Sequence, residues 1–181
     1  DYSGVWHLDE AGTGARFDST LAGNNLSTTN YEGDEAVVGK ISGADDFDGA
    51  VTNPDILIGP SSNAITGDNL ENITFSVWVN HSEITNNGYI ASIKRLSTGS
   101  TLFSLDAGTD TEIDSLGFLT ANAGGTGHNW LVDGDSYNDG EWYYLTAVVN
   151  GPSRYLYIDG DLKGSDSLDM QSVTGNTSAF T

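Results

Sequence analysis

The feature that most constrains the fold is the stretch GEWYYLTAVVNGPSRYLYIDGDL at residues 140–162. It holds two aromatic-rich apolar runs that are separated by Asn-Gly-Pro at 150–152, and the second run ends in Asp-Gly at 159–160. Aromatic and β-branched residues suit the pleated surface of a sheet, and Asn-Gly and Asp-Gly tolerate the positive φ of tight hairpin turns. The stretch therefore predicts antiparallel strands that are joined by tight turns.

Further strands are indicated by alternation of apolar and polar residues. The most regular case is NITFSVWVN at residues 72–80, where Ile73 and every second residue after it are expected to face the core. Short strands are also expected at residues 3–8, 88–95, 100–106 and 115–122. Many short strands without helical periodicity predict an all-β, antiparallel two-sheet β-sandwich of the jelly-roll type, as a single domain over residues 1–181.

The aromatic residues of these strands leave two interpretations open. Trp78 lies on the mixed face of its strand, where an indole can stack on a sugar ring or pack under a covering loop. Trp142 and the pair Tyr155 and Tyr157 are expected to pack as the spine of a sheet.

The charge excludes several classes of partner. The chain has 26 acidic and 6 basic residues, for a net charge of −20, and this field repels phosphate backbones and anionic lipid headgroups. Nucleic-acid binding is therefore not expected. No apolar window is long enough for a membrane span, so membrane insertion is not expected either. The chain starts at Asp1 and is expected to be a processed chain or a segment of a longer one.

Two acidic stretches offer oxygen ligands for calcium. The loop that follows residue 8 contains Asp9, Glu10 and Asp18, and the run at 45–48 contains three aspartates. Loop carboxylates and amides are typical calcium ligands. Asp and Asn are also ordinary turn formers that bond their own backbone, and the spacing matches no closed calcium motif.

A mixture of aromatic and polar residues precedes the hairpin stretch, at 123–142. Carbohydrate contact suits such a mixture, because rings can pack on sugars while polar groups bond hydroxyls. The residues chosen as candidate ligand contacts are His128, Trp130, Tyr137 and Asp139.

Three segments together resemble the laminin-G-like and concanavalin A-like lectin/glucanase jelly rolls. They are GVWHLDE near the start, ISGADDFDGA with NITFSVWVN in the middle, and DGEWYYLTAVVNGPSRYLYIDGDL near the end. The resemblance covers about residues 4–164. It implies a two-sheet jelly roll with a structural Ca²⁺ at the rim, for which the matching residues are Asp18, Asp48 and Gly49. The family typically adds one more strand after the position of Thr181, so an open sheet edge is expected here.

The same superfamily includes glucanases, whose catalytic strand places Glu, Asp and Glu at alternate positions. This chain has Glu112 and Asp114, but Leu116 stands at the third position. Without a second glutamate, acid and nucleophile cannot be divided between two carboxyl groups. The chain is therefore not expected to be an enzyme.

The resemblance and the residues together favour a non-catalytic, calcium-stabilised module that binds carbohydrate. It is expected at the cell surface or outside the cell, within a larger adhesion or secreted protein, with a glycan or a surface protein as its partner. A second hypothesis is a structural subunit of a filament or stalk, which self-associates by strand addition at the open edge. A glycoside hydrolase is the third.

Overall fold

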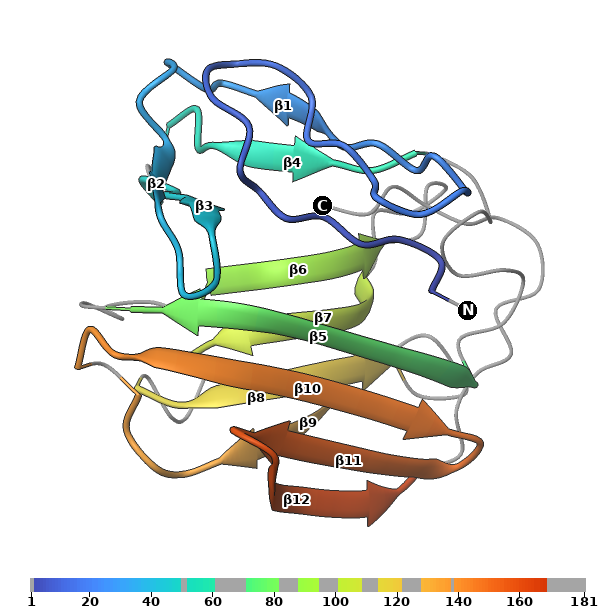
Figure 1. Cartoon of the computed structure of the whole chain (residues 1–181). Helices are drawn as coiled ribbons and strands as arrows, with labels where there is room; N and C mark the ends of the chain where they lie inside the picture. Colours follow the sequence, from blue (N-terminus) through green and yellow to red (C-terminus); the bar gives the residue numbers. More distant parts are fainter. Residues whose placement is uncertain are drawn as a thin grey trace. The chain divides into compact units, whose positions relative to one another are not determined.

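The computed structural model describes residues 2–49, 52–60, 71–81, 88–94, 101–108, 114–121, 128–137 and 139–168 (Figure 1). It contains two compact units, which are described separately. Unit 1 comprises residues 1–67 and 177–181, and unit 2 comprises residues 68–176. The described residues form strands and turns, and they include no helix that could span a membrane.

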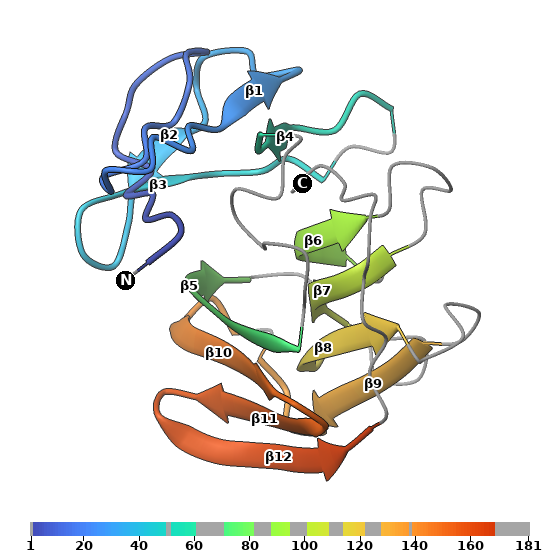
Figure 2. The same cartoon turned by 90° about the vertical axis from the view of Figure 1, so that its right-hand side faces the viewer.

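The described residues of unit 2 form two four-stranded antiparallel sheets, which Figure 2 shows on opposite sides of the unit. One sheet has the order β12-β11-β10-β5 and the other the order β6-β7-β8-β9. The strands are β5 (Asn72–Asn80), β6 (Gly88–Lys94), β7 (Thr101–Ala107), β8 (Leu116–Ala121), β9 (His128–Asp133), β10 (Trp142–Asn150), β11 (Ser153–Ile158) and β12 (Asp161–Ser167). This arrangement confirms the predicted all-β sandwich.

The core of unit 2 lies between these two sheets. Phe75 of β5 and Phe103 of β7 meet across it, with ring centroids 6.4 Å apart. Side chains that are completely buried come from both sheets, and they include Leu105, Phe118 and Leu145. Burial of a Leu or Phe side chain contributes roughly 1.5–3 kcal/mol, so this layer accounts for much of the stability of unit 2.

The hairpin stretch folds as predicted. β10 pairs with β11 from Leu145 to Asn150, and β11 pairs with β12 after the turn at 159–160. Asp159 and Gly160 have φ of 53° and 85°, the left-handed values that a tight hairpin turn requires. Asp159 also accepts a hydrogen bond from the Tyr144 N–H at 2.8 Å, so its side chain fastens the turn to β10.

The described part of unit 1 has four three-residue strands, in two antiparallel pairs, β1 with β4 and β2 with β3. The strands are β1 (Ser27–Thr29), β2 (Ala36–Val38), β3 (Gly43–Asp45) and β4 (Ile56–Ile58). The strand expected at residues 3–8 is not formed. Trp6 instead forms an isolated β-bridge to Asp18, and the N–H of Val5 donates to the Asp18 side chain.

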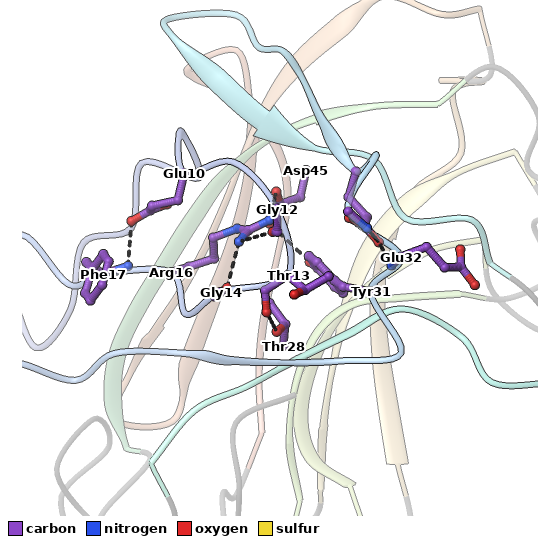
Figure 3. Close-up of polar contacts among 12 residues, drawn as sticks. Glu10, Gly12, Thr13, Gly14, Arg16, Phe17, Thr28, Tyr31, Glu32 and Asp45 are labelled. Carbon is purple, nitrogen blue, oxygen red and sulfur yellow. Dashed lines mark hydrogen bonds and ion pairs between the residues drawn. The ribbon is translucent and has the colours of Figure 1, made fainter.

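Unit 1 is organised around a buried arginine rather than an apolar layer (Figure 3). Nε and Nη2 of Arg16 donate to the two carboxylate oxygens of Asp45, both at 2.8 Å. Nη1 donates to the carbonyls of Gly12 and Gly14 at 3.1 and 2.8 Å. The guanidinium also lies 5.0 Å from the ring centre of Tyr31, whose hydroxyl donates to Asp45. The pair of Arg16 with Asp45 joins segments that are 29 positions apart in the sequence.

The expected open sheet edge is a prediction about the chain beyond β12. Residues 169–181, which follow β12, lie outside the described part of the chain.

Candidate functional site

The sheet β12-β11-β10-β5 carries a row of aromatic side chains on its outer face. Alternate residues of β10, such as Leu145 and Ala147, are completely buried, so their neighbours point away from the core. The register places Tyr144 opposite Trp78, and Thr146 opposite Tyr157. We call the outward set of β5, β10 and β11 the aromatic face: Asn72, Thr74, Ser76, Trp78, Asn80, Trp142, Tyr144, Thr146, Val148, Asn150, Ser153, Tyr155 and Tyr157.

Two pairs of rings dominate the aromatic face. The centroids of Trp78 and Tyr144 are 5.1 Å apart, with the ring planes inclined at 38°. Tyr155 and Tyr157 stack at 6.5 Å and 30°. Tyr144 donates its hydroxyl to Ser76 Oγ at 3.0 Å, which fixes the direction of its ring. The cross-strand contact of Trp78 with Tyr144 and the contact of Tyr155 with Tyr157 along β11 hold these rings in place, so the face offers pre-oriented aromatic surface.

The position of the tyrosine pair corrects a sequence-based expectation. Tyr155 and Tyr157 are not part of the core, since the buried residues of β11 are Arg154, Leu156 and Ile158. Arg154 is accommodated there because it pairs with Asp166 of β12, with Nε and Nη2 donating at 2.8 and 2.5 Å. An arginine on the inner side of β11 turns both tyrosines outward.

The aromatic face is polar but uncharged. None of its residues is Asp, Glu, Lys, Arg or His, although the chain carries a net charge of −20. Thr74, Ser76 and Tyr144 are exposed, and the rings of Tyr155 and Tyr157 are half-buried. Hydroxyl groups and ring faces therefore lie together on an open surface of the sheet.

Two of the predicted ligand contacts, His128 and Trp130, lie on the other sheet. They occupy alternate positions of the edge strand β9 and share one face of it, opposite Ala121 and Leu119 of β8. His128 is exposed and Trp130 is half-buried. Strand geometry therefore places these two side chains beside each other, about 7 Å apart along β9.

The other two predicted contacts, Tyr137 and Asp139, belong to the loop between β9 and β10. Tyr137 is only 5% exposed and donates its hydroxyl to Asp133. Its ring meets Tyr143 edge-on at 4.8 Å. Asp139 accepts the Tyr143 hydroxyl at 2.7 Å, and this bond raises the pKa of Tyr143 to about 12. The ring and hydroxyl of Tyr137 are thus used internally, so the structure gives this residue a packing role.

A lysine of β12 anchors the same loop. Lys163 Nζ lies 3.3 Å from carboxylate oxygens of both Asp133 and Asp135. These two carboxylates raise the pKa of Lys163. The four predicted contacts form two separate pairs. His128 and Trp130 lie on β9, whereas Tyr137 and Asp139 lie in the loop that follows the end of β9.

A buried carboxyl group on β7 was not predicted from the sequence. Asp106 is 2% exposed, and its Oδ2 accepts a hydrogen bond from Ser104 Oγ at 2.6 Å. Burial raises its pKa to about 7, although the bond from Ser104 acts in the opposite direction. Asp106 and Ser104 alternate with the core residue Leu105, so both lie on the outer face of the sheet β6-β7-β8-β9.

The glucanase-like series is incomplete in the structure. Leu116 is completely buried at the start of β8, and Glu112 lies outside the described residues. Asp114 forms a turn before β8, and its carbonyl accepts a hydrogen bond from Tyr137.

The predicted metal ligand Asp18 has its acceptor positions filled by protein donors. Its carboxylate accepts the N–H groups of Val5, Thr20 and Asn24, each at 2.9 Å, and the Thr20 hydroxyl at 2.7 Å. Burial opposes its ionisation, but these bonds lower its pKa to about 2. A carboxylate has about four acceptor sites, so a cation could bind here only by displacing these donors.

The predicted ligand Asp48 lies in a different, more acidic part of unit 1. Its N–H donates to Asp55 at 3.3 Å. Glu32, Asp34 and Glu35 have carboxylate oxygens within 4.8 Å of one another. The charge of Asp55, followed by burial and the charges of Asp34 and Asp48, raises the pKa of Glu32. Gly49, the third predicted ligand, follows directly and has φ of 61°.

The chain matches one family model by sequence and several solved structures by fold. The family model for the concanavalin A-like lectin/glucanases superfamily matches residues 48–181. The botulinum neurotoxin serotype D binding domain has a TM-score of 0.63 at 15% identity, covering 94% of this chain and 41% of that chain. No curated protein sequence matches significantly.

Two further structures have similar scores. One concerns botulinum neurotoxin type C, whose cell entry depends on interaction with two ganglioside molecules (TM-score 0.62, 12% identity, 96% of this chain and 42% of that chain). The other is the binding domain of botulinum neurotoxin DC in complex with rat synaptotagmin II (TM-score 0.61, 11% identity, 96% and 43%). This chain spans less than half the length of these structures, and the likeness shows the fold.

Proposed function

The chain belongs to the concanavalin A-like lectin/glucanases superfamily, and on this basis we propose that it is a non-catalytic module that binds carbohydrate. The membership confirms the predicted resemblance. The observation that carries the functional proposal is the aromatic face, where rings and hydroxyls lie together on an open sheet surface without any charged residue.

This surface has the chemistry that sugars require. The C–H faces of a pyranose ring are apolar and pack on aromatic rings, while sugar hydroxyls exchange hydrogen bonds with Ser, Thr, Asn and Tyr side chains. Tyr144 presents both kinds of group, since it is 37% exposed and its hydroxyl is held by Ser76. Rings that are fixed before binding lose little conformational entropy when the ligand arrives.

The residues of the aromatic face support binding without catalysis. Hydrolysis of a glycosidic bond usually requires two carboxyl groups on either side of that bond. The aromatic face contains no carboxyl group. On the other sheet, Asp106 is buried and bonded to Ser104, so it is not placed to reach a sugar at the surface.

The location and partners follow from the same proposal. We place the module outside the cell or at the cell surface, within a larger protein, where it would bind a glycan or a glycan-bearing surface protein. Two of the similar structures support a glycan or a surface protein as the partner. One concerns botulinum neurotoxin type C, whose cell entry depends on gangliosides, and the other is a toxin binding domain in complex with synaptotagmin II.

A calcium ion in unit 1 is a further part of the proposal. Glu32, Asp34 and Glu35 offer carboxylate oxygens within 4.8 Å of one another, and Asp48, whose charge is among those that raise the pKa of Glu32, is followed directly by Gly49 with its carbonyl. Calorimetric titration with CaCl₂ tests it: Glu32→Gln should weaken binding, and Asp18→Asn should not. Absence of binding at millimolar Ca²⁺ would refute it.

Binding to immobilised and soluble glycans tests the main function. We expect the unaltered protein to bind, and Tyr144→Val to weaken binding, because valine preserves strand propensity but removes the ring. Tyr2→Val is the matched control, since Tyr2 is 79% exposed and belongs to unit 1.

Trp130→Ala distinguishes the two candidate surfaces. If Trp130→Ala abolishes glycan binding and Tyr144→Val binds as the unaltered protein does, the binding site lies on the face of β9 that carries His128 and Trp130. Absence of binding to any glycan would refute the proposed function.

A further inference from the structure

We propose that the aromatic face binds an extended, uncharged polysaccharide along its length, rather than a terminal or acidic sugar. This inference rests on the proposed function and specifies the class of ligand. Three observations carry it: the distribution of rings over three strands, the hydroxyl groups between them, and the absence of charge.

The rings are spread over a distance that exceeds one sugar unit. Tyr157 is opposite Thr146, and Tyr155 is opposite Val148, so these rings lie one and two pleats along β10 from Tyr144. With about 3.4 Å per residue and about 4.8 Å between strands, Tyr155 is roughly 15 Å from Tyr144. Trp78 extends the row by one more strand, because it is opposite Tyr144 on β5. Such a row suits several consecutive sugar units.

Hydroxyl groups occupy the positions beside the rings. Ser76 and Tyr157 flank Thr146 on its two neighbouring strands, and Thr74 and Tyr155 flank Val148 in the next row. Side-chain hydroxyls can both donate and accept hydrogen bonds, as sugar hydroxyls do. Bound sugar units would therefore meet both a ring and hydrogen-bonding groups in the three adjacent rows that contain Tyr144, Thr146 and Val148.

The charge distribution selects against acidic glycans. None of the thirteen residues of the aromatic face is Asp, Glu, Lys, Arg or His, whereas the chain as a whole carries a net charge of −20. The nearest turn adds two exposed carboxylates, Asp159 and Asp161, at one end of β11. A uronate or sulfated chain would meet repulsion from this field without any cation on the face to compensate. A neutral chain incurs no such penalty.

The experiment compares ligand length and charge on the whole protein. Calorimetric titrations use neutral oligosaccharides of the gluco-, xylo- and manno-series, from disaccharide to hexasaccharide, and acidic oligosaccharides from alginate and polygalacturonate. We expect binding to at least one neutral series, an affinity that rises with length, and no binding of the acidic series in low-salt buffer.

Two ring variants locate the chain on the face. Tyr144→Val and Tyr157→Val should each weaken hexasaccharide binding about tenfold, which corresponds to about 1.4 kcal/mol. Disaccharide binding should respond to one variant at most. Circular dichroism and thermal melting establish that each variant folds. Tyr89→Val is the control, because Tyr89 is exposed on β6 of the other sheet.

The outcomes separate this inference from the proposed function. Tight binding of a mono- or disaccharide without any gain from length, or preferential binding of acidic oligosaccharides, would overturn the inference and leave a glycan-binding module. Binding of a long neutral chain that neither tyrosine variant affects would also overturn it, because the chain would lie elsewhere. No binding to any glycan would overturn both.

Discussion

Among the described residues, each unit contains one completely buried arginine, and these two arginines are bound in the same way. Arg16 and Arg154 each form a two-pronged pair with an aspartate through Nε and Nη2. Each donates through Nη1 to two further oxygens and lies over an aromatic ring, at 5.0 Å from Tyr31 and 5.3 Å from Phe118. The same local chemistry therefore occurs in two very different surroundings.

The difference lies in what else each unit buries. Among the described residues of unit 1, the buried apolar side chains are Leu26 and Tyr31, and the strands have three residues each. Unit 2 has long strands and a continuous apolar layer. The partners differ too, since the side chain of Asp45 is 0% exposed and that of Asp166 is 35% exposed. The arginine pair thus replaces a core in unit 1 and supplements one in unit 2.

The largest effect is expected for Arg16→Met. This change leaves the buried Asp45 carboxylate without its cation, and breaking a buried pair in this way costs about 3–5 kcal/mol. Native-state hydrogen exchange is the measurement. The amides of residue 16 and Leu26, which bond each other's carbonyls at 2.9 Å, should exchange faster, while Leu145 and Leu156 of unit 2 stay protected.

A double variant checks the cause of that loss. Arg16→Met combined with Asp45→Leu replaces both charges by apolar groups, and such replacements are often neutral or stabilising. Protection of Leu26 should return towards that of the unaltered protein. If the single variant leaves exchange unchanged, the buried pair does not organise unit 1 and the comparison of the two units fails.

The two units should respond to pH in opposite directions. Burial raises the pKa of Asp106 in unit 2 to about 7 from 3.8, so the folded state holds a proton that the unfolded chain releases. The contribution of Asp106 to the free energy of unfolding of unit 2 is fully present below pH 3.8, and it is lost as the pH rises to about 7. At about 1.4 kcal/mol per pKa unit, the loss is at most about 4 kcal/mol.

Asp18 of unit 1 has the reverse sign. Hydrogen bonds outweigh burial and lower its pKa to about 2, so its contribution is present above pH 3.8 and is lost as the pH falls towards 2. Exchange measured from pH 2 to pH 8 should show that Asp106→Asn removes the loss in unit 2 at rising pH. Asp18→Asn should reduce the acid sensitivity of unit 1. Parallel responses of both units would contradict this assignment.

The fold of unit 2 could be predicted because its determinants are local. Alternation in residues 72–80 and the Asp-Gly turn at 159–160 each specify strand faces or turn geometry within a few residues. Unit 1 could not be predicted in this way. Its main contacts are polar and distant in sequence, since Arg16 and Asp45 are 29 positions apart. No periodicity marks such a pair.

The aromatic face was missed for a related reason. In the run SRYLYI of β11, Arg154 shares one face with Leu156 and Ile158, and its charge favours solvent for that face, which leaves the core to Tyr155 and Tyr157. The arrangement is reversed because Asp166, Thr120 and the carbonyl of Asn129 satisfy the buried guanidinium. Once a charged residue is paired inside the sandwich, the pattern of its strand no longer distinguishes the two faces.

The smallest effect is expected for Arg154→Met, and it addresses the comparison most directly. Asp166 is 35% exposed and can regain water when its partner is removed, so a loss of about 1–3 kcal/mol is expected instead of the larger loss for Arg16. Urea unfolding followed by hydrogen exchange at Leu156 provides the measurement. Asp166→Asn is the matched control, because it keeps the side-chain volume and leaves the arginine buried without a carboxylate. It should therefore be the more damaging of the two changes. If Arg154→Met instead destabilises unit 2 as strongly as Arg16→Met destabilises unit 1, exposure of the aspartate is not what distinguishes the two pairs.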